Sequence, residues 1–271
     1  MTALDITPVP DYRQFARLDG KGYVVIGAGQ GIGRQAAHAL TQAGAKVMCV
    51  GRGREMTEAV AGEVGGFACL GDATQRSDVE RIFSEAEETL GGVHGIVDSL
   101  GMVRRKALLD FTDEDWEWQF DIVLRHAFLA MQIGGRAIAR SGGGSITFVG
   151  STAGMTWSTC HTVYGTAKAA LHNMVRTAAV ELAPLGVRVN AVVPGVVRTP
   201  RVQAYLDAGR GETAVNYYPL GRLATPAEIA SVILFMATDS SAYVTGQALL
   251  VDGGLLSQSP MPDSVWFPEN R

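Results

Sequence analysis

Short apolar runs alternate with stretches of helical periodicity along most of the chain. The runs expected to form strands are Gly22–Ile26, Lys46–Val50, Phe67–Leu70, Gly95–Asp98, Ser145–Val149, Val187–Val193 and Ala248–Val251. The helical stretches lie near residues 32–43, 76–90, 113–140, 161–183 and 226–237. The strands are continuously apolar rather than alternating, which is expected when helices cover both faces of a parallel sheet. The pattern therefore predicts an α/β fold with a doubly wound parallel sheet of about seven strands.

No internal repeat or interdomain linker interrupts this alternation, so we predict a single domain over residues 1–271. Three peripheral segments are expected: an N-terminal extension (1–17), a weakly periodic substrate loop with a short helix (198–218) and a C-terminal tail (255–271). Because an exposed Trp266–Phe267 pair would be costly, we expect it to pack on a neighbouring surface, such as another subunit.

Composition narrows the class of protein. Hydrophobic residues make up 47% and charged residues 18% of the chain, which is typical of a globular protein. A net charge of −4 argues against nucleic acid or an anionic membrane as the main partner. Cys49, Cys69 and Cys160 lack metal-ligand spacing, which predicts reduced thiols, no metal site and a cytoplasmic location. We find neither a signal-peptide pattern at the N-terminus nor an apolar run long enough to span a bilayer.

A glycine-rich loop, Gly27-Ala-Gly29-Gln-Gly31-Ile-Gly33, joins the first predicted strand to the first predicted helix. Glycines in this context allow a tight turn and a close approach of a pyrophosphate, whose charge the helix N-terminus stabilises. The alternative is a structural turn that packs helix against strand. The strand–loop–helix context favours binding of a dinucleotide.

The end of the second strand bears on which dinucleotide is bound. A carboxylate there would hold the ribose 2′-hydroxyl of NAD, but the chain has Gly51 followed by Arg52. A guanidinium suits the 2′-phosphate of NADP, so we favour NADP over NAD; the alternative is that Arg52 is a solvated loop charge. Asp72, after the third strand, is expected either to contact the adenine amino group or to form a turn.

Tyr164 and Lys168 form a YxxxK pair that helical spacing places on one face. An ordinary tyrosine pKa near 10 is too high for a base at neutral pH, and a nearby ammonium lowers it. The pair alone arises often by chance. Here it follows the fifth predicted strand, which ends near Ser151.

Together these features resemble the short-chain dehydrogenase/reductase family, a Rossmann-type fold, from about residue 18 to 254. The matching segments, in order, are the glycine loop, Ser151, Tyr164-Gly-Thr-Ala-Lys168, Asn190-Ala-Val-Val-Pro194-Gly195-Val-Val-Arg-Thr199, Pro219-Leu-Gly-Arg-Leu-Ala-Thr-Pro-Ala-Glu228-Ile and Asp252-Gly-Gly254. The resemblance implies an oxidoreductase that moves a hydride between a nicotinamide dinucleotide and a ketone or secondary alcohol.

The resemblance assigns three catalytic roles. Tyr164 is the general acid/base, Ser151 holds the substrate oxygen, and Lys168 binds the nicotinamide ribose and tunes Tyr164. The residues expected to contact the cofactor are Gly27, Gly29, Gln30, Gly31, Ile32, Gly33, Arg52, Asp72, Ala73, Gly101, Tyr164, Lys168, Pro194, Gly195, Val197 and Thr199.

The chain departs from the family pattern at three places. Ile26 stands where the family has a threonine that braces the glycine loop. The family's Asn-Asn-Ala-Gly is Asp-Ser-Leu-Gly at residues 98–101. Val123 aligns with a catalytic asparagine that holds a water in a proton relay from Lys168. Either another group replaces it, with His126 one candidate, or turnover is slow; otherwise His126 is a packed or solvent-facing residue.

The substrate is expected to meet Ser151, Trp157 and Tyr205 in an aromatic-rich pocket. Met102, Met155, His161, Tyr217 and Tyr218 are further expected lining residues. Arg104, Arg105 and Lys106, with Arg198 and Arg201, are expected either to meet an acidic substrate group or to form a solvated or subunit-contact face. The alternatives to an NADP-dependent enzyme are the same reaction with NAD and a weakly active or non-catalytic dinucleotide sensor. The family resemblance also implies a homotetramer or homodimer.

Overall fold

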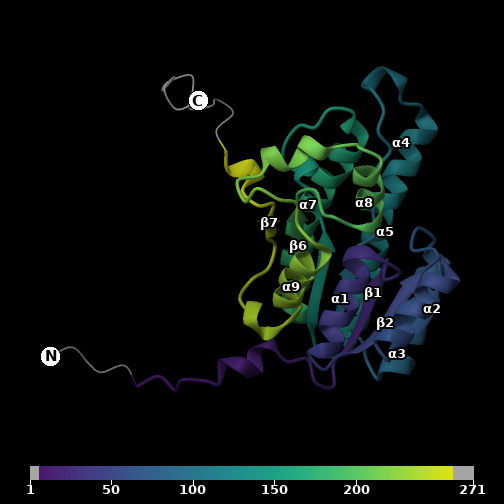
Figure 1. Cartoon of the computed structure of the whole chain (residues 1–271). Coiled ribbons are helices and arrows are strands. Elements are labelled where there is room, and N and C mark those ends of the chain that lie inside the picture. The colour runs from purple at the N-terminus through teal and green to yellow at the C-terminus, as the bar shows by residue number, and fades with distance from the viewer. Residues whose placement is uncertain (1–5, 259–271) are drawn as a thin grey trace.

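The computed structural model describes residues 6–258, and a seven-stranded parallel sheet forms its centre (Figure 1). The strands are β1 (Gly22–Ile26), β2 (Lys46–Gly51), β3 (Phe67–Leu70), β4 (Gly95–Asp98), β5 (Gly144–Val149), β6 (Val187–Pro194) and β7 (Ala248–Val251). They are ordered β3-β2-β1-β4-β5-β6-β7, with Val24 of β1 paired with Met48 on one side and Ile96 on the other. The predicted doubly wound sheet and its strands are confirmed.

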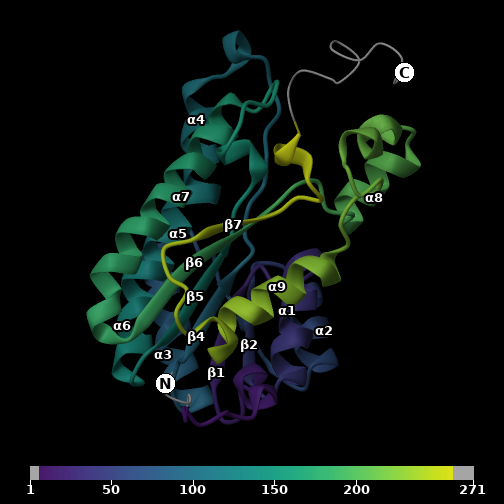
Figure 2. The same ribbon diagram turned by 90° about the vertical axis from the view of Figure 1, so that its left-hand side faces the viewer.

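Helices cover both faces of the sheet, as Figure 2 shows. One face is covered by α1 (Gly31–Gln42), α2 (Arg54–Glu63) and α9 (Pro226–Ala237). The other is covered by α3 (Arg76–Leu90), α7 (Thr162–Leu182) and the helix that follows β4. Because apolar side chains of each strand enter both cores, β1 is buried along its whole length.

The helix after β4 departs from the prediction. In place of one continuous helix over 113–140, it comprises α4 (Asp113–Phe120), α5 (His126–Leu129) and α6 (Gly135–Arg140), separated by π-helical turns at Asp121–Arg125 and Ala130–Gly134. Such turns often occur at functional sites. Its start is a capping box in which Thr112 and Asp115 each bind the other's backbone N–H.

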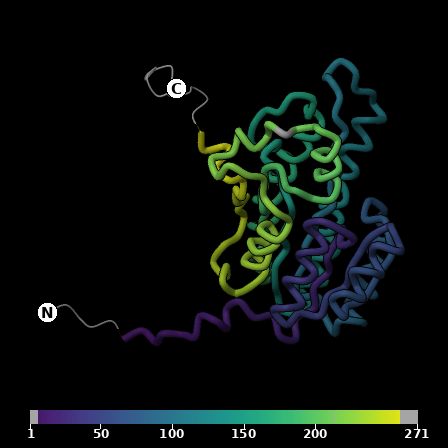
Figure 3. The backbone as a smooth tube through the Cα atoms, in the orientation of Figure 1, coloured from purple at the N-terminus to yellow at the C-terminus, as the bar shows by residue number. Residues whose placement is uncertain are grey.

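Helix α2 was not predicted; only Thr57, Val60 and Ala61 of its ten residues are buried. Residues 198–218 hold the expected short helix, α8 (Pro200–Asp207), and a 3-10 segment at Glu212–Tyr217. Figure 3 shows this segment at the end of the molecule opposite the N-terminal extension. No helix within residues 6–258 has the length and hydropathy that a membrane span requires. Trp266 and Phe267 lie outside the described residues.

Candidate active site

The loops that were assigned to the site all leave the carboxyl ends of the strands. The glycine loop follows β1, Arg52 follows β2, Asp72 follows β3, Gly101 follows β4 and Ser151 follows β5. In open α/β sheets, ligands bind in the crevice at this edge. The parallel order of the sheet therefore brings these distant segments to one end of the molecule.

The glycine loop forms a cradle that side chains would fill. Gly27 has φ +82°, and a Cβ on Gly33 would lie 2.2 Å from the Gly27 carbonyl oxygen. Gly31 also has a positive φ. The Ser99 hydroxyl lies 3.1 Å and 3.2 Å from the carbonyl oxygens of Ile26 and Gly27. Ser99, just after the neighbouring strand β4, thus supplies the bracing hydroxyl that Ile26 lacks.

Helix α1 begins without a side-chain cap, since Gln30 makes no capping hydrogen bond. Its first backbone N–H groups therefore face the cradle with the partial positive charge of a helix N-terminus. This combination of close backbone approach and free N–H groups fits the pyrophosphate of a dinucleotide.

Residue 51, at the end of β2, is a glycine and carries no carboxylate; a Cβ there would lie 2.6 Å from the Thr57 hydroxyl oxygen, so a larger side chain would require Thr57 to shift. Arg52 is largely exposed and its guanidinium lies 3.4 Å from Asp72. The Asp72 carboxylate accepts hydrogen bonds from the backbone N–H and hydroxyl of Thr74 at 2.9 Å and 2.7 Å. Asp72 therefore forms a turn, the alternative that the sequence left open.

The turn after β6 approaches the glycine loop from the other side. The Thr199 methyl would lie 3.2 Å from a Cβ on Gly31. Thr199 also caps α8 by accepting the Val202 N–H, and Val197 pairs with Ala224 in an isolated bridge. The crevice is thus bounded by two backbone segments, at 27–33 and 194–199.

Tyr218 does not line an open pocket, which corrects the prediction for this residue. It is buried, and its hydroxyl oxygen accepts the Val196 N–H at 2.8 Å. A Cβ on Gly195 would lie 2.9 Å from that same oxygen. Tyr218 therefore packs against the Pro194–Gly195 turn and supports it.

The structure brings Tyr164, Lys168 and Ser151 together at the start of α7. The Lys168 ammonium lies 5.9 Å from the centre of the Tyr164 ring. Burial raises the pKa of Tyr164, while the Ser151 hydroxyl and the positive charge of Arg105 lower it. Ser151 also caps the short turn at Thr152–Gly154, which fixes its side chain near the phenol.

Lys168 is almost completely buried, and its ammonium donates a 2.7 Å hydrogen bond to the Val149 carbonyl oxygen. Burial lowers its pKa to about 8, and the Asp98 carboxylate partly offsets that effect. Gly101 lies close to this ammonium, since a Cβ at residue 101 would be 3.3 Å from the Lys168 nitrogen. Both Gly101 and Lys168 thus face one space beside Tyr164.

Below Lys168, Asp98 and His126 form a buried pair. The His126 Nε2 lies 3.2 Å from the Asp98 carboxylate, which also accepts the Leu100 N–H at 3.0 Å. His126 is therefore a packed residue, as one interpretation of the sequence proposed. The Val123 side chain is fully buried in the cluster that contains Ala167 and contributes no polar group.

Arg104 and Lys106 do not point toward a substrate. Both bind the carboxylate of Asp115, Arg104 at 2.8 Å, and this carboxylate is only 6% exposed. The Arg104 guanidinium also lies 4.2 Å from the centre of the Trp118 ring. A carboxylate of α4 thus already engages both cations, which favours a structural role over the expected contact with an acidic substrate group.

The remaining expected substrate residues are exposed. Trp157 is 86% exposed and Tyr205, on α8, is 44% exposed. Arg105 is exposed and donates a hydrogen bond to His161 at 3.2 Å.

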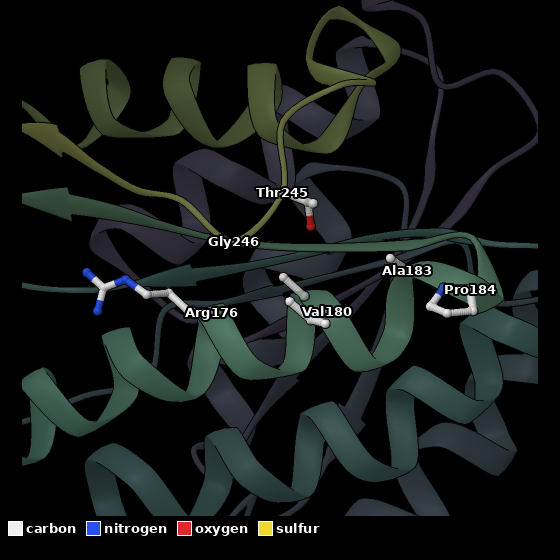
Figure 4. A pocket seen from close by; sticks show the side chains of 7 residues that line it. Arg176, Val180, Ala183, Pro184, Thr245 and Gly246 are labelled. Atoms are coloured by element: carbon white, nitrogen blue, oxygen red, sulfur yellow. The ribbon is translucent and has the colours of Figure 1, made fainter.

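A shallow apolar groove lies at the other end of α7 (Figure 4). It is lined by Arg176, Ala179, Val180, Ala183, Pro184, Thr245 and Gly246. Arg176, the lining residue of α7 nearest to Tyr164, lies three turns beyond it, about 18 Å along the helix axis. The groove is therefore separate from the catalytic residues.

Comparison with known proteins places this geometry in a family. A family model described as enoyl-(acyl carrier protein) reductase matches residues 27–256. The chain belongs to the short-chain dehydrogenase/reductase family. It is 34% identical to 3-oxoacyl-[acyl-carrier-protein] reductase FabG of Thermotoga maritima, over 89% of this chain and 99% of that protein. It is 36% identical to L-xylulose reductase of Bos taurus, over 89% and 98%.

Among solved structures, a 7 alpha-hydroxysteroid dehydrogenase complexed with NADH and 7-oxo glycochenodeoxycholic acid superimposes with a TM-score of 0.85 at 28% identity. The superposition covers 90% of this chain and 98% of that one. The protein is accordingly an NAD(P)-dependent oxidoreductase of this family that acts on a carbonyl or alcohol group.

Reasoning from the sequence missed three residues at the site. Ser99 and Asp98 were noted only as departures from a motif, and Asp115 was not singled out. A polar residue at the end of a predicted strand was the available signal for the first two. The partners of Asp115 depend on how the loop after β4 folds back, which no local pattern shows.

Proposed function

We propose that the chain catalyses NADP(H)-dependent interconversion of a ketone and a secondary alcohol, with Tyr164 as general acid/base. The observation that carries the proposal is the convergence of Tyr164, Ser151 and Lys168 beside the glycine cradle. Hydride transfer to a carbonyl leaves negative charge on its oxygen, and a positioned proton donor stabilises that charge.

The proton steps follow from the contacts of these three residues. When bound, the nicotinamide dinucleotide supplies or accepts the hydride. Tyr164 donates its phenolic proton to the carbonyl oxygen, or takes the alcohol proton in the reverse direction. Ser151 donates a hydrogen bond to the same oxygen. The Lys168 ammonium, held by the Val149 carbonyl, stabilises the phenolate left on Tyr164.

The test is turnover of a panel of ketones and secondary alcohols, followed by the absorbance of the reduced cofactor. Tyr164→Phe should lower kcat by on the order of 10²–10⁴ because it removes the proton donor. Tyr243→Phe, at a fully exposed tyrosine before β7, is the matched control. A Tyr164→Phe variant as fast as wild type would refute the assigned role.

We also propose that NADP is preferred over NAD. Two observations support this preference: residue 51, a glycine, offers no carboxylate, and Arg52 stands exposed at the strand end. Arg52→Asp should shift the ratio of kcat/KM values toward NAD. Arg54→Asp is the control, since this exposed arginine is paired with Glu58. An unchanged ratio in Arg52→Asp would exclude this residue from cofactor selection.

The expected substrate contacts by Trp157 and Tyr205 remain part of this proposal, as do the expected cofactor contacts at 27–33, Arg52, Asp72, Ala73, Gly101, Tyr164, Lys168, Pro194, Gly195, Val197 and Thr199. The second candidate function is a non-catalytic dinucleotide sensor, which the buried, apolar Val123 favours. Cofactor binding without turnover of any compound in a broad panel would support the sensor.

We propose that the protein assembles as a homodimer or homotetramer. Val180 on α7, Phe235 on α9, and Leu249 and Leu250 on β7 are large apolar side chains left exposed on one chain. Light scattering should give a mass of two or four chains. A double Leu249→Glu, Leu250→Glu variant should lower that mass if β7 forms a contact.

A further inference from the structure

Arg105 differs from the two cations that flank it. Arg104 and Lys106 both bind the buried carboxylate of Asp115 on α4. The Arg104 backbone N–H is held in addition by the Gln119 side chain at 2.8 Å. The residues on either side of Arg105 are therefore fixed, while its own side chain points elsewhere.

The charge of Arg105 is not neutralised by any described carboxylate, since none within residues 6–258 lies within 4 Å of its guanidinium. Its Nε donates a 3.2 Å hydrogen bond to Nε2 of His161. The His161 Nδ1 lies 2.7 Å from the Thr159 carbonyl oxygen and must donate its hydrogen there. Nε2 therefore carries the lone pair that accepts from Arg105, and the imidazole is neutral.

This contact fixes the guanidinium through Nε and leaves its two terminal nitrogens available. A guanidinium binds a carboxylate or phosphate with its parallel N–H groups. No side chain in the described part of the chain takes a hydrogen bond from those terminal nitrogens. Arg105 is thus oriented by a neutral group and open to an oxyanion.

Arg105 is also close to the reacting group. The His161 ring packs edge-on against Tyr164, with ring centres 6.1 Å apart, and the charge of Arg105 lowers the pKa of the phenol. The Lys106 N–H donates to the carbonyl oxygen of Cys160, which joins the segment after β4 to the loop before α7. Cys160 has φ +62°, the one positive φ outside glycine among the described residues. Arg105 therefore sits where two loops meet at the mouth of the crevice.

We infer that Arg105 binds an anionic group of the substrate, so that the physiological compound is a carbonyl or alcohol bearing a carboxylate or phosphate. This inference rests on the proposed function, because it places the oxyanion at Arg105 when the reacting oxygen is at Tyr164. The neighbouring Trp157 and Tyr205 would then contact the part of the molecule between the two groups.

The test compares matched compounds on wild type and Arg105→Gln: a series of aliphatic keto acids, their uncharged methyl esters, and keto phosphates of the same chain lengths. We expect wild type to prefer one anionic series, and Arg105→Gln to raise its KM about 10-fold or more with little change in kcat. The KM of the esters should not change. Arg105→Lys should recover part of the loss, and Arg136→Gln, at an exposed arginine on α6, controls for net charge.

Equal effects on acids and esters would overturn the inference and assign Arg105 to positioning His161 and Tyr164. Isothermal titration of keto acid and ester into the protein with NADP separates this result from failure of the proposed reaction. Selective binding of the acid that Arg105→Gln abolishes, without turnover, would support the anion site and refute the dehydrogenase. Turnover of acid and ester with equal KM would support the dehydrogenase and refute the anion site. Absence of both binding and turnover would refute the anion site and the dehydrogenase together.

Discussion

Replacing His126 by alanine should destabilise the fold mainly through its buried partner, Asp98. Both side chains are at most 1% exposed, and Nε2 of the histidine is 3.2 Å from the carboxylate. In His126→Ala the carboxylate keeps the Leu100 N–H at 3.0 Å and its electrostatic attraction to the Lys168 ammonium. Leaving a buried carboxylate without one of its partners costs about 1–3 kcal/mol, because the lost contact offset part of its desolvation.

A double-mutant cycle isolates this contribution from the cavity that the alanine creates. Asp98→Asn keeps the shape and a carbonyl oxygen but removes the charge, so His126→Ala should cost about 2 kcal/mol less in the Asp98→Asn background than in wild type. His172→Ala is the matched control. His172 is also buried, and burial together with Lys168 and Arg176 lowers its pKa to about 4, so it is neutral.

The assay is urea unfolding followed by tryptophan fluorescence, at one fixed protein concentration so that any assembly contributes equally. The midpoints and slopes of the four variants give the coupling energy. His172→Ala and Asp98→Asn should be additive within about 0.5 kcal/mol. If His126→Ala and Asp98→Asn are equally additive, the pair contributes no specific stability and the reasoning fails.

Three further predictions concern the cofactor side of the site. Burial lowers the pKa of Lys168 to about 8 from 10.5, so the unfolded chain binds more protons than the folded chain above neutral pH. Wild type should therefore gain about 2 kcal/mol in free energy of unfolding, relative to Lys168→Met, between about pH 7 and about 9.5. A difference that does not change with pH would contradict the lowered pKa. Gly33→Ala should abolish cofactor binding, measured by titration calorimetry, because its Cβ would lie 2.2 Å from the Gly27 oxygen, and tight binding would show that the cradle tolerates side chains. Ser99→Ala should weaken cofactor binding by about 10-fold while leaving the circular dichroism spectrum unchanged, and unchanged affinity would mean that the loop needs no hydroxyl.

Much of the fold could be predicted because the strands carry an unusually direct signal. A strand buried on both faces reads as a continuous apolar run, and β1 and β4 begin and end at the predicted residues. Helix α2 was not predicted because only three of its ten residues are buried. The π-helical turns around His126 also escaped, since an extra residue in a helical turn leaves no distinct mark on apolar periodicity.

In the candidate site too, the features set by local spacing could be predicted and those set by long-range contacts could not. Tyr164 and Lys168 lie one helical turn apart, so local spacing alone fixes their common face. The partners of Arg104 and Lys106 depend instead on a loop that folds back to Asp115, and their charges alone suggested a substrate contact. Long-range pairing decides whether a surface cation is free: Arg104 and Lys106 share the Asp115 carboxylate, whereas Arg105 faces no described carboxylate.

The brace on the glycine loop shows that a chemical requirement can be met in space rather than at a fixed place in the sequence. The hydroxyl near the carbonyl oxygens of Ile26 and Gly27 comes from Ser99, seventy-three residues after the first and on the adjacent strand's exit. A motif search that demands threonine at residue 26 would score this chain as defective. Proteins with an aliphatic residue there should instead be inspected across the sheet, where a compensating serine or threonine separates a working loop from a degenerate one.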